Sequence, residues 1–397
     1  MSSELEPPEK KPKLTGNNDL CIETIDKCIE NITSSEKNLQ PIINDEFHMP
    51  IQLVKVYVGH IRSAKDISRT ILILNERIPL KELSHLKRVR CQCIILCPTT
   101  FLHNMSSIQE YIEIHALELK DVFDYFKEIN VPLLPPKIVS QYNETKKVWP
   151  CNFHPNTYFE KLVSDHFFSS YDVKLHRQFM GVVFEIAKWY VMHKGTSSVV
   201  GGIFENVNVT VVVNPINNRI VTIAYDYRHN HPMQHSAMLA IDNVAKTQNG
   251  GVWSTDYDNN LLPGLEQELI DYLKEKFSHF GIGMKKSKTD VQEEKSVNDL
   301  HGEGCGAKTD LHGEDCGHKT VVHGETKEKD GPYLCTGYYI YMLREPCVMC
   351  AMGLVHARAK RIFYCFNNSD TGALNSVVKL QTVASLNHHF EVFSGFL

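Results

Sequence analysis

The sequence predicts an α/β protein with two folded units. Short apolar runs, typical of buried strands, alternate with segments of helical periodicity in both halves of the chain. The chain has 397 residues, whereas a single domain usually contains about 100–200 residues. A proline-rich stretch, VPLLPPKIV, marks a boundary between the halves. We therefore expect a smaller α/β or α+β domain at 46–148 and a larger α/β domain at 149–397.

The N-terminal residues 1–45 are polar and rich in Pro, Lys and Glu, so we expect a disordered tail there. The tail has no apolar segment of a signal peptide, and the chain has no run of about 18 apolar residues, so no membrane association is expected. An intracellular location follows, and the basic run at 10–13 is a candidate nuclear import signal. We expect the protein in the nucleus and the cytoplasm.

In the smaller domain, the patterns predict a strand at 51–61, a helix at 63–78, a strand at 90–97 and a long helix at 108–126. The formal net charge of the chain is −5, so any surface for nucleic acid must be a local patch. This half contains one dense cluster of basic residues. The simpler interpretation is that the cluster is a solvated helix end, but the cluster is also the candidate RNA contact. Its members are Lys81, Lys87, Arg88 and Arg90.

In the larger domain, helical periodicity covers 172–193, and residues 208–227 read as two strands joined by a tight turn. A second helical pattern covers 265–277. Residues from about 285 to 331 lack Phe, Tyr, Trp and Ile, so they are expected to be a low-complexity insertion. The pattern after it, at 336–366, predicts strand, turn, helix and strand.

Inside the insertion, an 11-residue repeat covers 300–326. Its His and Cys residues could bind a metal, but the Gly-rich context and tandem similarity favour a duplicated, tolerated insertion.

The candidate chemistry lies at His235, Cys347 and Cys350. Two cysteines three positions apart on a helix point to the same side, and Pro346 favours a helix start beside them. The partial positive charge at a helix N-terminus stabilises a thiolate. Two thiolates and one imidazole are a typical three-ligand zinc set. Taken separately, the cysteines could be a redox or core pair and the histidine a hydrogen-bonded one.

The order of these motifs matches zinc nucleobase deaminases, in which His-x-Glu is followed by Pro-Cys-x-x-Cys. The segments QHSAMLAIDNVA, GPYLCTGYYIYMLREPCVMCAMGLVHARAKRIFY and SLNHHFEVFSGFL resemble the non-catalytic subunit of the eukaryotic tRNA-specific adenosine deaminase, and VWPCNFHPN resembles the entry to its deaminase domain. The resemblance is close over about 100 residues.

The resemblance implies a cytidine-deaminase-like domain, a five-stranded mixed sheet flanked by helices, in which His235, Cys347 and Cys350 bind Zn²⁺. It also implies a catalytic adenosine deaminase subunit as partner and tRNA as substrate, with adenosine converted to inosine at the anticodon wobble position. Active members have Glu two residues after the histidine, where this chain has Ala237. The loss of such a proton carrier typically costs about 10²–10⁴-fold in rate.

Three residues are considered as substitutes for the missing carboxylate. Asp242 lies seven positions beyond His235, about 10 Å along a helix, and Glu345 also occurs in active relatives. His231 is the remaining candidate. We therefore expect a catalytically silent subunit. The alternatives are an active deaminase with a displaced proton donor, and a zinc-stapled interaction module unrelated to RNA.

Overall fold

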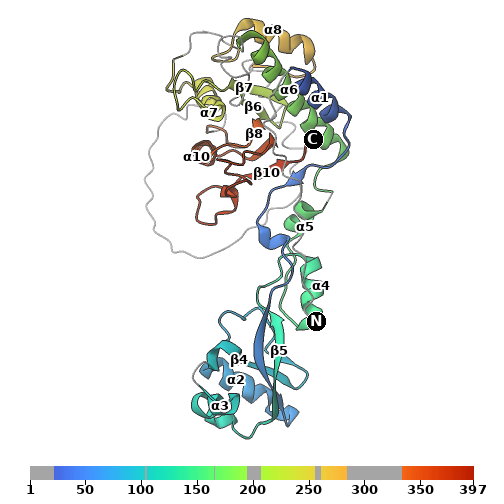
Figure 1. Ribbon diagram of the computed structural model, residues 1–397, viewed down its shortest axis with the longest axis vertical. Coiled ribbons are helices and arrows are strands. Elements are labelled where there is room, and N and C mark those ends of the chain that lie inside the picture. The colour runs from blue at the N-terminus through green and yellow to red at the C-terminus, as the bar shows by residue number, and fades with distance from the viewer. Residues whose placement is uncertain (1–21, 103–104, 165, 195–206, 255–260, 284–332) are drawn as a thin grey trace, which may run out of the picture. The chain divides into compact units, whose positions relative to one another are not determined.

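A computed structural model describes residues 22–102, 105–164, 166–194, 207–254, 261–283 and 333–397 (Figure 1). The basic run at 10–13, the insertion at 285–331 and the repeat at 300–326 lie outside these residues. The chain divides into two compact units, a smaller one at Ile43–Phe167 and a larger one at Met1–Ile42 with Phe168–Leu397. In the part of the chain that the structure describes, no helix is both long and apolar enough to cross a membrane.

A six-stranded mixed sheet forms the centre of the larger unit. Strands β8, β9 and β10 are parallel, and the other neighbouring pairs are antiparallel. In spatial order the strands are β1 (Gln40–Pro41), β10 (Glu391–Ser394), β9 (Arg361–Phe366), β8 (Tyr339–Arg344), β6 (Val209–Asn214) and β7 (Arg219–Tyr225). The predicted hairpin is confirmed, since β6 pairs with β7 across a turn in which Asn218 has a φ of 55°.

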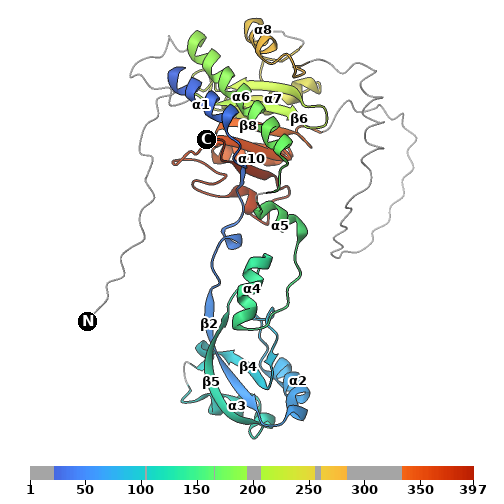
Figure 2. The same cartoon turned by 90° about the vertical axis from the view of Figure 1, so that its right-hand side faces the viewer.

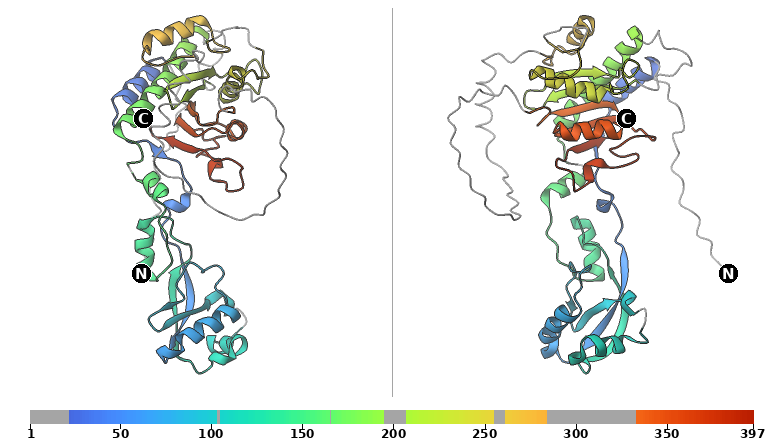
Figure 3. Two further views of the ribbon diagram at one scale, coloured as in Figure 1. Left: turned by 180° about the vertical axis from the view of Figure 1, so that it is seen from behind. Right: turned by 90° about the vertical axis from the view of Figure 1, so that its left-hand side faces the viewer.

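Helices cover both faces of this sheet, so the unit has three layers (Figure 1). On one face α7 (Ser236–Thr247) packs against α10 (Val348–His356), as the right-hand view of Figure 3 shows. On the other face lie α1 (Ile22–Ser34) and α6 (Ser170–Lys194), side by side in Figure 2, with α8 (Gln267–Lys276) against α6. The predicted three-layer α/β fold is therefore confirmed, and β1 adds a sixth strand to the five expected.

The alternation of side chains along β8 fills both interfaces at once. Ile340 and Met342 are buried in the core shared with α7 and α10. Tyr341 points the other way, where its hydroxyl lies 2.8 Å from Nδ1 of His176 on α6. Successive strand residues point to opposite faces, so a strand buried on both sides is apolar throughout, as this one is.

The expectation of a disordered tail at 1–45 is wrong for the described residues 22–42. Helix α1 buries Ile25 and Ile32 completely against the larger unit, and β1 pairs with β10 at the sheet edge. Isoleucines at 25, 29 and 32 follow the helical spacing of three and four residues. That short pattern was masked by the polar residues around it.

The smaller unit is built on a four-stranded antiparallel sheet, with strand order β3-β4-β2-β5. Its strands are β2 (Leu53–Ile61), β3 (Val89–Arg90), β4 (Cys93–Pro98) and β5 (Phe123–Pro132). One face packs against α2 (Ile67–Arg77) and α3 (Ile108–His115). The other face is covered in part by Leu83, Leu86, Trp149 and Tyr142 of α4 (Val139–Val148). The short helix α5 (Thr157–Val163) completes the unit.

Two predictions for this region are wrong. The helix expected at 108–126 ends at His115, because Phe123 begins a strand that pairs with β2 along its whole length. The domain boundary expected at 148/149 falls instead after Phe167. Trp149 and Cys151 belong to the core of the smaller unit, and the indole of Trp149 donates a hydrogen bond to the carbonyl of Lys87 at 2.6 Å.

Candidate metal centre

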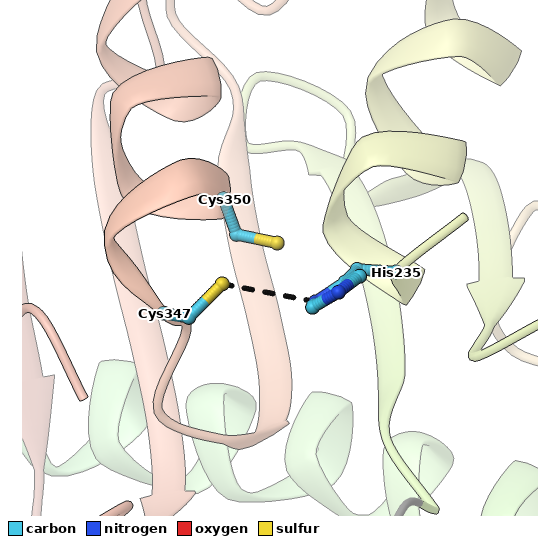
Figure 4. Close-up of side chains that lie close together, drawn as sticks. All are labelled: His235, Cys347 and Cys350. Carbon is cyan, nitrogen blue, oxygen red and sulfur yellow. Dashed lines mark hydrogen bonds between the residues drawn. The ribbon is translucent and has the colours of Figure 1, made fainter. Parts of the chain in front are cut away.

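His235, Cys347 and Cys350 come from the starts of two neighbouring helices. His235 is the residue before α7 and Cys347 the residue before α10, and both have extended backbone geometry. Cys350 lies in the first turn of α10, where it is buried. Helix α10 begins at Val348, two residues after Pro346, so Pro346 precedes the capping residue Cys347. Figure 4 shows both sulfur atoms pointing toward the imidazole.

The spacing of the three side chains fits a zinc ion. Sγ of Cys347 lies 3.7 Å from Nδ1 of His235, and the three candidate ligand atoms lie within 4.8 Å of one another. Around tetrahedral zinc, with bonds of about 2.0–2.3 Å, ligand atoms would lie about 3.6–3.8 Å apart. Of the residues described, this trio is the one group of three such side chains close enough to share a metal. Its role as a zinc site stays a prediction.

The two thiols share a hydrogen bond that makes them chemically different. Donation from the Cys350 thiol, helped by backbone N–H groups at the helix start and by His235, lowers the pKa of Cys347 to about 5. The same hydrogen bond, with burial and the neighbouring thiolate, raises the pKa of Cys350. One thiolate is thus stabilised before a metal arrives, and a metal would displace the remaining proton.

No carboxylate occupies the position that active deaminases use for proton transfer. Ala237 is completely buried, within the core that also contains Cys350. Asp242 is engaged elsewhere: its carboxylate lies 2.8 Å from Nζ of Lys246 and accepts a hydrogen bond from the backbone N–H of Val252. His231 is exposed, and its Nδ1 accepts a hydrogen bond from the N–H of Met233 in its own turn.

Glu345 is the carboxylate closest in sequence to the cysteines, but it acts as a structural acceptor. Glu345 is buried, with 1% of its surface exposed. Three successive backbone N–H groups, of residues 374–376, donate to its Oε1 at 2.6–2.9 Å. Its Oε2 accepts from the N–H of Asn368 and the hydroxyl of Ser376. With both oxygens fully used, Glu345 fixes the loop at 368–376 against the start of α10.

Gly372 makes this arrangement possible. A Cβ atom there would lie 2.3 Å from Oε2 of Glu345, and Gly372 pairs with Cys347 in an isolated β-bridge. The loop therefore lies directly against both the carboxylate and the first cysteine.

One further carboxylate near the site was missed in the sequence. Asp226, 7% exposed, follows β7, and its charge acts on the Cys350 thiol. Its Oδ1 accepts hydrogen bonds from Nε of Arg228 at 2.7 Å and from the backbone N–H of the same residue. The D-x-R pattern directly after the hairpin is the signal that could have identified it. Both hydrogen bonds hold the Asp226 carboxylate to Arg228 in its own turn.

The structure separates the four candidate RNA contacts, which lie in the smaller unit. Lys81, Lys87 and Arg90 are exposed, and Arg90 also donates a hydrogen bond to the carbonyl of Val148. Assigning Arg88 to this group is wrong. It is 9% exposed and donates hydrogen bonds to the carbonyls of Ile78, Ile95 and Leu96 and to the side chain of Asn75. Burial lowers the pKa of Arg88 to about 10. Through its hydrogen bonds, Arg88 connects β4 to helix α2 and its C-terminal end.

Comparisons with known proteins agree with the resemblance noted in the sequence. No family model matches the chain. The chain is 27% identical over 371 residues to the "probable inactive tRNA-specific adenosine deaminase-like protein 3" of Danio rerio, covering 90% of this chain and 91% of that one. It is 28% identical over 411 residues to the "tRNA-specific adenosine deaminase TAD3" of Arabidopsis thaliana, covering 88% and 92%.

A shorter match has a higher identity: 42% over 64 residues with the "tRNA-specific adenosine deaminase subunit tad3" of Schizosaccharomyces pombe, covering 16% of this chain and 20% of that one. A solved structure from work on tRNA:A34 deaminases matches 55% of this chain and 98% of its own, at 15% identity and a TM-score of 0.26. The relatives with long matches establish kinship over about nine-tenths of the chain.

Proposed function

We propose that this chain, a relative of the inactive tRNA-specific adenosine deaminase-like proteins, is the catalytically silent subunit of a heterodimeric tRNA adenosine deaminase. The assembled enzyme would convert adenosine to inosine at the anticodon wobble position. One observation carries the proposal: the three candidate ligands come together, while the position of the proton carrier holds the buried Ala237. The nearby carboxylates of Asp242, Glu345 and Asp226 already accept hydrogen bonds from other groups.

In this proposal zinc would be held by His235, Cys347 and Cys350. A bound zinc ion would supply Lewis acidity in an active deaminase, but here it would serve to join the starts of α7 and α10. The three residues already approach one another, so little rearrangement would be needed. Without a proton carrier, the chain's own residues bind and position, and the partner subunit supplies the carboxylate.

The proposed partners are a catalytic subunit and tRNA. In the smaller unit, Lys81, Lys87 and Arg90 are exposed, which supports RNA binding through contacts with phosphates. Such binding needs a local basic surface but not a basic protein. A protein that acts on tRNA would be expected in the nucleus and the cytoplasm.

The test is co-expression of this chain with the catalytic subunit of the same organism. Each chain alone and the purified pair would be assayed, with zinc, for inosine in an anticodon stem-loop with a wobble adenosine. We expect inosine from the pair and none from this chain alone. Inosine produced by the isolated chain would overturn the proposal.

A further inference from the structure

One end of the sheet in the smaller unit carries an aromatic pair, an exposed Tyr125 and a half-buried His60. On the face also occupied by Val58 and Ile95, His60 of β2 lies directly opposite Cys93 of β4 and Tyr125 of β5. Directly opposite residues of antiparallel strands point to the same face. The three side chains therefore form a row across the strands, which lie side by side in Figure 2.

This face is covered at one end and open at the other. Val56, Val58 and Val131 are completely buried beneath the layer that contains Trp149. Beyond them, Tyr125 is 50% exposed and Lys127 is also exposed. Lys127 lies opposite Val58, so it belongs to the same face. A strand that extends past its own cover leaves its last side chains available to a ligand.

The aromatic pair is held in a fixed orientation. The rings of His60 and Tyr125 are stacked, with centroids 4.9 Å apart and planes 7° apart. A register shift beside His60 leaves Asp124 as an extra residue in β5. Its carboxylate lies 3.3 Å from Nδ1 of His60 and accepts a hydrogen bond from Nε of Arg62 at 2.9 Å. This contact fixes the imidazole, and stacking on the imidazole fixes the tyrosine ring.

The surroundings of the pair are basic. The side chain of Arg62 is 63% exposed, and Lys127 lies two residues along β5 from Tyr125. The acidic Asp124 contacts both His60 and Arg62 and offsets part of the charge of Arg62. Exposed Lys127, and Arg90 opposite Cys93 in the same row, supply the other positive charges. A flat, exposed ring between cations is the combination that binds an unpaired nucleotide, since the base stacks on the ring and the phosphates approach the cations.

We propose that the His60–Tyr125 pair is a stacking platform for an unpaired nucleotide of RNA, with Arg62 and Lys127 beside it to receive the phosphates. The proposal rests on the proposed function, which makes tRNA the ligand. It adds a site on the sheet face, and Arg90 of the basic cluster lies in the same row, opposite Cys93 of β4. Four-stranded sheets that stack bases on exposed aromatics are a known mode of RNA recognition.

The test measures binding of the full chain to two fluorescently labelled probes, a 12-nucleotide single-stranded RNA and an unmodified tRNA. Tyr125→Ala should weaken binding of the single-stranded RNA by about 5- to 150-fold, since stacking contributes about 1–3 kcal/mol per base. Tyr125→Phe, which keeps the ring, should restore most of the affinity. Arg62→Gln should weaken binding less.

Two matched variants control for exposure and charge. Phe101 is 51% exposed in the same unit but lies outside the sheet, and Arg77 is an exposed arginine paired with Glu118. Phe101→Ala and Arg77→Gln should leave both affinities unchanged. Unfolding curves of Tyr125→Ala and Tyr125→Phe would show whether the sheet stays folded.

Equal binding by Tyr125→Ala and the unchanged chain would overturn the platform, as would equal losses in Tyr125→Ala and Phe101→Ala. A wild-type chain that binds neither RNA would overturn it as well. The proposed function fails separately, if the assembled pair forms no inosine while Tyr125 still determines binding of the single-stranded RNA.

Discussion

The two units of this protein use polar groups in opposite ways. Around the candidate metal centre of the larger unit, Glu345, Asp226 and Asp242 are buried, and each accepts hydrogen bonds from nearby residues. On the sheet of the smaller unit, Tyr125 and Arg62 are exposed. In the first arrangement these three carboxylates act as structural acceptors. The second arrangement offers a ring and charges to a ligand, as the proposed binding role requires.

The largest expected effect comes from removing the metal ligands. Cys347→Ser with Cys350→Ser should abolish zinc binding, because two of three ligands are lost. At a metal concentration 1,000-fold above Kd, the free energy of unfolding should fall by about 4 kcal/mol. Metal analysis and denaturant unfolding measure both changes. Cys335→Ala, at another completely buried cysteine, should retain one zinc per chain, and zinc retained by the double variant would refute the assignment.

Two neighbouring basic residues should contribute very differently to the free energy of unfolding. Arg88→Ala should lower the free energy of unfolding by about 2–4 kcal/mol, since it leaves buried carbonyls of Ile78 and Leu96 without their donor. Lys87→Ala should change it by less than about 0.5 kcal/mol, because the side chain is exposed. Urea unfolding compares the two variants. Similar losses would mean that the burial of Arg88 does not matter to the fold.

The loop beside the candidate metal centre should tolerate no added methyl group at Gly372. Gly372→Ala should destabilise the protein by about 1–3 kcal/mol, because its Cβ would overlap Glu345 and the carbonyl of Asn368. Gly181→Ala is the matched control on α6, where the new methyl would meet nothing within 4 Å apart from its chain neighbours and the adjacent helix backbone. It should stabilise by about 0.5–1 kcal/mol through helix propensity. Equal effects of the two changes would show that the packing around Glu345 is loose.

The smallest expected effect concerns the basic cluster. Replacing Lys81, Lys87 and Arg90 with Gln should weaken tRNA binding mainly at low salt. The slope of log K against log salt concentration should become shallower by about 0.7–0.9 for each phosphate that the protein no longer neutralises. Binding measured across a salt series tests this. An unchanged slope would remove the cluster from the RNA surface.

Periodicity and spacing predicted much of the larger unit. The hairpin at 208–227 and the helix around Cys350 are local patterns, so the sequence contains them. The approach of His235 to Cys347 across 112 positions followed from motif order and not from distance along the chain. What failed depended on tertiary contacts: Phe123 pairs with a distant strand, and α1 is stabilised by packing against α6.

The same limit applied to the site residues. Arg88 and Arg90 are indistinguishable as basic residues in a sequence, but only one side chain turns into the core. The role of Glu345 depends on a loop more than 20 residues away, which donates to both of its oxygens. His60 and Tyr125 are 65 positions apart and meet because of strand register, which a single sequence does not reveal.

The proposed function requires above all that this chain contributes no proton carrier of its own. The direct test is single-turnover inosine formation by the assembled pair, after the catalytic subunit's carboxylate next to its histidine ligand is replaced by alanine. This chain stays unchanged in the experiment, with zinc present. We expect that no inosine forms, although tRNA still binds. Inosine formed by that pair would contradict the proposal, because a group in this chain would then be moving the proton.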